Sequence, residues 1–145
     1  MREELLAYAL LMDVRIISHS EYTEYLDTQF IRAPDDDLLL ELEWCFSDIQ
    51  KAISIVREHY YDYSLDYATF GRFLFSKLQD IYFQNKMDIQ TFAAKSYAVW
   101  SQLPNAINQT EPFWTLSYAD DPLSWGDEKQ TRELYEKAFR FYDKA

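Results

Sequence analysis

Apolar residues recur along the chain every three or four positions, and no segment shows the sustained two-residue alternation of a strand. The spacing predicts seven longer helices and a short one, over residues 3–17, 19–30, 36–46, 47–59, 66–83, 88–103, 127–143 and 112–119. The connections are short, and no linker is long enough to divide the chain. We therefore expect a single all-α domain over residues 1–145, a bundle of about seven helices.

Polar residues that can cap helices stand just before most of these segments. The expected caps are Ser18, Ser47, Asp66, Asp88 and Asp127. The segment ISHSEY at 17–22 also resembles MDIQTF at 87–92, because each contains an apolar residue, a cap and a helix start. Unrelated helix starts share that pattern, so it is weak evidence of an internal repeat.

Length and composition agree with this fold class. At 145 residues, of which 48% are hydrophobic, the chain can bury one sizeable core. It has two glycines and four prolines, whereas all-β folds use many of both in turns. The first residues lack the features of a signal peptide, and no apolar run reaches the roughly 18 residues of a membrane-spanning helix, so we expect a cytoplasmic protein. The single cysteine, Cys45, allows no internal disulfide.

The charge is strongly negative and unevenly distributed. The chain has 25 acidic and 14 basic residues, for a formal net charge of −11. Residues 33–50 contain six acids and no base, and residues 108–127 contain four acids and no base. This acidity disfavours nucleic acid and anionic membranes as partners and favours a basic protein.

Residues that usually carry catalysis or bind metals are scarce. Neither His19 nor His59 stands in a Glu-x-x-His or His-x-x-x-His pattern, so no helical metal site is predicted. No nucleophile motif is present, and two isolated glycines make no phosphate-binding loop. The arginine–histidine spacing of the helical HEPN ribonucleases is not met by Arg15 and His19. We predict no catalytic residue, metal or cofactor; the alternative is a small helical hydrolase or ribonuclease with an atypical site.

The first acidic stretch contains a candidate contact patch. Three leucines fall on one face of the expected 36–46 helix, whereas Leu40 and Trp44 fall on the opposite face. The acids around these two residues are Asp35, Asp36, Asp37 and Glu43. Either the helix is buried on both faces or it presents an exposed patch, and we favour the patch because burial would dehydrate the acids. Capping and the helix dipole also explain acids in a first turn.

The second acidic stretch, residues 110–127, holds two tryptophans and two prolines and is the least helix-like part of the sequence. Its candidate contact residues are Trp114, Tyr118, Asp120, Asp121 and Trp125. The aromatic residues either cover the helical core or form exposed anchors, since Trp and Tyr are frequent in interface hot spots.

The stretches PDDDLLLELEW at 34–44 and EPFWTLSYADDPLSW at 111–125 give the chain a resemblance to bacterial immunity proteins of toxin–immunity modules. Those proteins are small, often acidic, cytoplasmic and aromatic-rich on the face that binds the toxin. The resemblance implies a non-enzymatic protein that neutralises a basic partner, such as a nuclease toxin. Leu40, Trp44, Trp114 and Trp125 would anchor it, and the acids would steer it. The same aromatic patch would also suit self-association of two copies of this chain.

Overall fold

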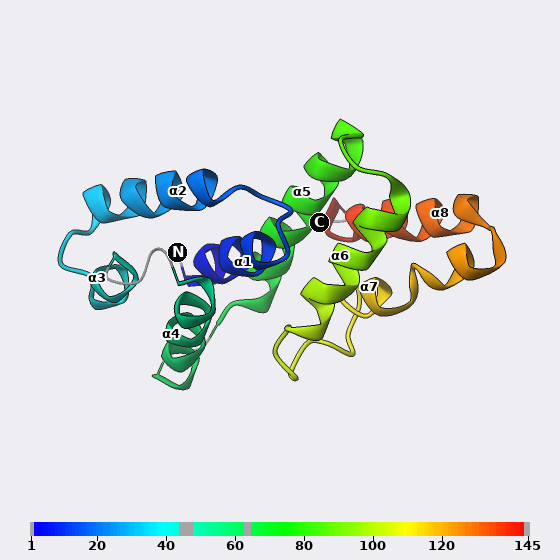
Figure 1. The fold of residues 1–145 in the computed structure, drawn as a ribbon. Coiled ribbons are helices and arrows are strands. Elements are labelled where there is room, and N and C mark those ends of the chain that lie inside the picture. The colour runs from blue at the N-terminus through cyan, green and yellow to red at the C-terminus, as the bar shows by residue number, and fades with distance from the viewer. Residues whose placement is uncertain (1, 44–47, 63–64, 144–145) are drawn as a thin grey trace. The chain divides into compact units, whose positions relative to one another are not determined.

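The computed structural model describes residues 2–43, 48–62 and 65–143, and over these residues the chain forms helices and no strand (Figure 1). The α-helices are α1 (Arg2–Asp13), α2 (His19–Arg32), α3 (Asp37–Glu43), α4 (Ile49–Asp62), α5 (Tyr67–Gln84), α6 (Ile89–Ser101), α7 (Thr115–Tyr118) and α8 (Glu128–Phe139). Two 3₁₀ helices are η1 (Asp121–Trp125) and η2 (Phe141–Asp143). The all-α class is confirmed, and eight α-helices in the described part are close to the expected number.

The chain divides into two compact units, Met1–Phe70 and Gly71–Ala145. The base-free residues 33–50 belong to the first unit, and the base-free residues 108–127 belong to the second. The single-domain organisation expected from the sequence stays a prediction.

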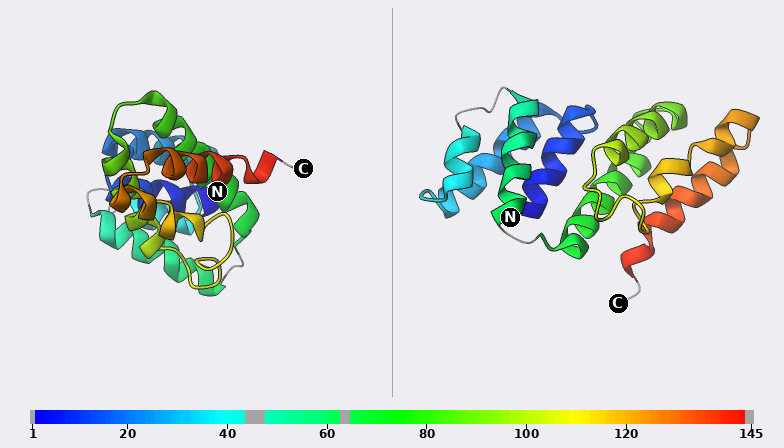
Figure 2. Two further views of the ribbon diagram at one scale, coloured as in Figure 1. Left: turned by 90° about the vertical axis from the view of Figure 1, so that its right-hand side faces the viewer. Right: turned by 90° about the horizontal axis from the view of Figure 1, so that it is seen from below.

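In the first unit, α1 contacts α2, α2 contacts α3, α3 contacts α4, and α4 returns to α1 (Figures 1 and 2). Every residue from Leu5 to Met12 is more than nine-tenths buried. Residues 5–12 span two helical turns, so this part of α1 is buried on all sides, which is typical of a helix that is apolar all round. Polar contacts fix its two neighbours: Tyr25 of α2 donates to the Glu4 carboxylate at 2.5 Å, and Gln50 of α4 donates to Asp13 at 2.6 Å.

The first helix is shorter than expected, ending at Asp13 instead of residue 17. Arg15 adopts a left-handed backbone with φ of 61°, which stops helical hydrogen bonding and turns the chain toward α2. The turn after α5 has the same construction, with Asn85 at φ 56°. In each case the next helix is capped three residues later, by Ser18 and by Asp88. The similarity seen between residues 17–22 and 87–92 therefore extends to the backbone of the preceding turn.

Four of the five expected caps are confirmed by a side-chain oxygen that accepts a hydrogen bond from a first-turn amide. They are Ser18 for α2, Asp66 for α5, Asp88 for α6 and Asp127 for α8. The fifth, Ser47, lies outside the described residues. At the start of α4, Asp48 accepts from the Lys51 amide at 3.1 Å, so this acid is the cap.

In the second unit, α6 packs on α7, and α7 packs on α8. The core between α5, α6 and α8 is built from aromatic rings. Tyr82 of α5 contacts Phe92 of α6 and Phe139 of α8 edge-on, with ring centroids 5.4 and 5.3 Å apart. Tyr135 stands edge-on to Phe92 at 5.0 Å. Such ring pairs add about 0.5–1.5 kcal/mol each beyond the area they bury, so this cluster sets the position of α8 within the unit.

The same unit needs a glycine at position 71 of α5. A Cβ atom added there would come within 2.8 Å of the Phe113 ring and would occupy the space of the Tyr142 hydroxyl. The missing side chain therefore lets the segment before α7 and the residues after α8 approach α5.

Candidate partner-binding surfaces

The acids at the start of α3 have two different roles. Asp36 is the cap of this helix, because its Oδ1 atom accepts from the Leu39 amide at 3.1 Å. Asp35 and Asp37 are exposed, and within the described residues neither forms an ion pair with a lysine or arginine. Capping therefore explains one acid of the expected cluster, and two remain available to solvent or to a partner.

The two faces of α3 differ as the leucine pattern predicted. Leu38, Leu39 and Leu42 are buried, whereas Leu40 is 39% exposed. Exposure of Leu40 agrees with a contact patch and not with a helix buried on both faces. Trp44, the second residue of the expected patch, lies outside the described residues, as does Cys45.

A pair of carboxylates joins α2 to α3 beside this patch. Glu43 at the end of α3 faces Asp27 of α2, and partial burial together with the Asp27 charge raises the pKa of Glu43. Leu40 precedes Glu43 by one helical turn, and Ile31, which is 81% exposed, follows Asp27 by one turn. Asp27 and Ile31 were not predicted from the sequence, because nothing in their spacing shows which side of α2 meets α3. We call Asp27, Ile31, Asp35, Asp37, Leu40 and Glu43 the α2–α3 surface.

In the second unit, three of the five expected residues are exposed. Trp114 is 39% exposed and Trp125 is 63% exposed, and Asp121 is exposed at the start of η1. Most of the Trp125 side chain is therefore in contact with solvent and does not cover the core. The alternative that both tryptophans cover the core is wrong for this residue. Trp125 is followed by Gly126, whose φ of 80° ends η1 before α8 begins.

Trp114 belongs to a row of four rings that we call the aromatic strip. Along it, Tyr97 contacts Trp100 with centroids 5.5 Å apart, Trp100 contacts Trp114 at 5.9 Å, and Trp114 contacts Tyr118 at 6.4 Å. The Trp100 indole donates to the Asn108 carbonyl at 2.7 Å, which fixes the middle of the strip.

Tyr97, the first ring of the strip, is 44% exposed, and its neighbour Ser96 is buried. The spacing of Tyr97 and Trp100 places them one turn apart on α6, and Trp114 and Tyr118 are one turn apart at α7. The sequence therefore indicates that each pair of rings shares one side of its helix. It does not indicate that the two pairs contact each other, because that contact depends on how α7 packs on α6.

The other two expected residues, Tyr118 and Asp120, are half-buried. Tyr118 donates to Glu111 Oε1 at 3.4 Å, and Thr115 donates to the other oxygen of the same carboxylate. Burial, with a contribution from the charge of Asp121, raises the pKa of Asp120. Neither residue therefore serves as a simple exposed contact.

Asp120 belongs to a buried polar group between α6 and α8. Its Oδ1 atom and the hydroxyls of Ser96, Thr131 and Tyr135 have no hydrogen-bond partner among the described residues. Burial and the Asp120 charge both raise the pKa of Tyr135, while the nearby Ser96 hydroxyl opposes this shift without meeting hydrogen-bond geometry.

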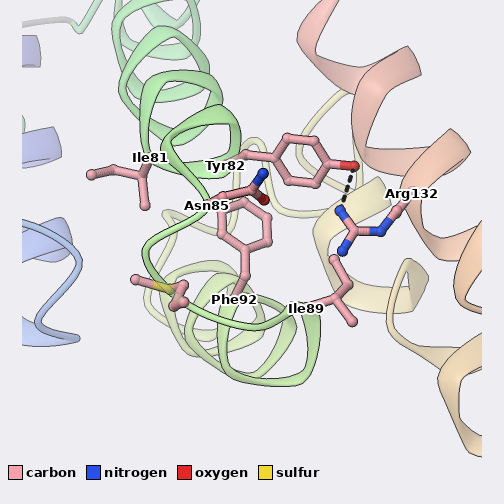
Figure 3. Close-up of a pocket in the computed structure, with 7 residues that line it drawn as sticks. Ile81, Tyr82, Asn85, Ile89, Phe92 and Arg132 are labelled. Atoms are coloured by element: carbon pink, nitrogen blue, oxygen red, sulfur yellow. Dashed lines mark hydrogen bonds between the residues drawn. The ribbon is translucent and has the colours of Figure 1, made fainter.

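A cavity beside Arg132 is too small to be a binding site (Figure 3). Its volume is about 10 Å³, roughly the space that one water molecule needs. Arg132 donates to Glu128 at 2.9 Å and to the Tyr82 hydroxyl at 3.3 Å, and its guanidinium lies 5.6 Å from the centre of the Tyr82 ring. These contacts give Arg132 a structural role, which is to attach α8 to α5. Glu128 and Arg132 form the i, i+4 ion pair that their spacing favours.

Neither a metal site nor a membrane span is found among residues 2–43, 48–62 and 65–143. Within them, no three histidine, cysteine or acidic residues come together as a metal site would require. No helix there has both the length and the apolar character needed to cross a bilayer. Comparisons with protein-family profiles, curated proteins and solved structures find no significant match to this chain.

Proposed function

We propose that this chain is a non-enzymatic binding protein for a basic protein partner, and that it acts by covering the partner's cationic surface. The observation that carries the proposal is the aromatic strip, of which two rings, Trp114 and Tyr118, belong to the base-free acidic stretch of the second unit. Tyrosine and tryptophan dominate interface hot spots because they offer large, rigid contact area with a polar end. The acids account for the choice of a cationic partner.

The α2–α3 surface would supply a second group of contacts. Its exposed acids would speed association with a cationic partner, while Leu40 and Ile31 offer apolar area beside them. A protein with these properties fits the role of an immunity protein, held in the cell that makes a nuclease-type toxin. Association between two copies is disfavoured by this reading, because each copy carries a net charge of −11.

The proposal is tested by affinity purification from the native cells with three forms of the chain. The first is the natural chain, the second carries Tyr97→Ala and Trp114→Ala, and the control carries Phe83→Ala. Phe83 is an exposed ring of the same unit and has no ring contact with the strip. We expect a lysine- and arginine-rich protein to bind the natural chain and the control, with at least about 30-fold weaker binding to the double variant.

Two further measurements separate binding from neutralisation. The dissociation constant of the purified complex should rise steeply with salt, and less steeply after Asp35→Asn and Asp37→Asn, because fewer charges then attract the partner. The partner alone should slow growth, and co-expression of the natural chain should restore it. The proposal would be contradicted if the double variant bound the partner as tightly as the natural chain. A partner without an excess of basic residues would also contradict it.

A further inference from the structure

The aromatic strip ends at a groove between the segment before α7 and the last helix. Its volume is about 290 Å³, near the lower end of the roughly 300–1,000 Å³ typical of ligand pockets. That size suits one long side chain better than a large cofactor. Tyr118 is both the last ring of the strip and a wall of the groove, so the two features are continuous.

One wall of the groove carries a carboxylate in a fixed orientation. Thr115 donates to one oxygen of Glu111, and Tyr118 donates to the other at 3.4 Å. An ionised carboxylate has about four acceptor positions, so each oxygen can still accept from a ligand. Two fixed oxygens in one plane match the paired N–H groups of a guanidinium, which binds carboxylates with two parallel hydrogen bonds.

The rest of the groove is largely apolar. Leu134 of α8 and Phe141 of η2 line one side of the groove, and Ala138, which is buried, also belongs to the lining. Such a surface covers the methylene groups of a long basic side chain, whose charged end then reaches the acid. The Tyr118 ring adds a face on which a planar cation can stack, and arginine uses such faces better than lysine does.

We propose that this groove binds an arginine side chain of the basic partner, with the guanidinium on Glu111 and the methylene groups on Leu134 and Phe141. The inference rests on the proposed function, and it adds the residue type that the second unit recognises. Lys137 also lines the groove, on the side of α8. Its charge opposes a cation, so this residue provides a test with the opposite sign from Glu111.

The probe is N-acetyl-arginine amide, titrated into the isotope-labelled full chain and followed by the amide signals of Thr115 and Leu134 in NMR spectra. We expect saturable shifts, about tenfold weaker binding after Glu111→Gln, and binding within about twofold of the natural chain after Glu133→Gln. Glu133→Gln removes the same charge from an exposed position outside the groove lining. Lys137→Gln should strengthen binding about threefold, since it removes a like charge.

A second variant leaves Glu111 unchanged. Leu134→Trp should fill the groove and abolish the shifts, while thermal melting checks that each variant is folded. Equal weakening by Glu111→Gln and Glu133→Gln, weaker binding after Lys137→Gln, or equal binding of N-acetyl-lysine amide would each overturn the inference. If the arginine probe fails but the partner still requires Tyr97 and Trp114, the groove assignment alone is wrong. If the partner binds equally well without those two side chains, the proposed function is wrong, whether or not the arginine probe binds.

Discussion

On the α2–α3 surface, the neighbouring carboxylates of Glu43 and Asp27 lower the stability of the folded chain. Two carboxylates face each other across α2 and α3, and the pKa of Glu43 is raised by partial burial and by the Asp27 charge. At neutral pH the ionised pair therefore opposes folding. A protein that keeps such a pair gains negative potential at a price in stability, which is consistent with the attraction of a cation.

Asp27→Asn should stabilise the protein by about 0.5 kcal/mol at pH 7, because one of two like charges disappears. The folded pKa of Glu43 lies above its unfolded value, so its contribution to stability is complete below the unfolded pKa, near 4.3, and declines as pH rises through the folded pKa. The gain from Asp27→Asn should therefore grow over that same pH range and be small at about pH 3.

The measurement is urea unfolding at several pH values, with Glu24→Gln as the matched control. Glu24 is exposed on α2 one turn before Asp27, and its replacement removes the same charge. A control that stabilises as much as Asp27→Asn would show a general charge effect and would exclude the specific pair.

At the scale of helices, the caps explain where the elements begin. Ser18 accepts from the Glu21 amide at 3.2 Å, directly after the turn in which Arg15 is left-handed. The same arrangement stands before α6, where the Thr91 amide and hydroxyl lower the pKa of Asp88. Each cap satisfies a first-turn amide and so defines the direction in which the second helix leaves the turn.

Ser18→Ala should lower the free energy of unfolding by about 1 kcal/mol, because a first-turn amide of α2 loses its acceptor. Ser18→Asp is the control and should retain the natural stability, since its carboxylate accepts the same bond and is favoured by the helix dipole. Chemical denaturation followed by circular dichroism measures both. Equal losses in the two variants would mean that the hydroxyl has another role.

The sequence predicted most helix starts, because capping is local and requires a particular residue type. It predicted the end of α1 poorly, because this helix ends where Arg15 adopts a left-handed conformation. Arginine seldom adopts that conformation, so its presence in the sequence does not indicate a helix end. For the candidate site, the sequence left the exposure of Trp114 open, whereas the exposure of Leu40 followed from helical spacing. The contact of Trp100 with Trp114 and the pairing of Asp27 with Glu43 did not, because both depend on how separate helices pack.

At the scale of the whole molecule, each unit holds its own candidate surface. The α2–α3 surface belongs to the first unit, and the aromatic strip and the arginine groove belong to the second. The second unit also has a core of its own, formed by rings from α5, α6 and α8. Domains with an independent core can fold alone in principle.

Residues 66–145 should therefore fold in isolation, with a cooperative thermal transition and a helical circular dichroism spectrum. This segment keeps all of α5 and its cap, Asp66, which accepts from the Thr69 amide at 3.1 Å. Residues 71–145 are the control; they lack the cap and the first turn and should melt at a lower temperature. A gradual loss of helix without a transition in the longer segment would show that the second unit needs the first.

The contact between Trp100 and Trp114 has a spectroscopic consequence. Their ring centroids are 5.9 Å apart, and the ring planes are inclined by 70°. Two indoles so close and so far from parallel share their electronic excitations, which splits the absorption band and gives paired circular dichroism signals of opposite sign. A partner that docks on the strip would tilt or cover one indole and change that couplet. The protein therefore carries its own optical reporter of occupancy, and Trp114→Phe should silence it while leaving a ring in place.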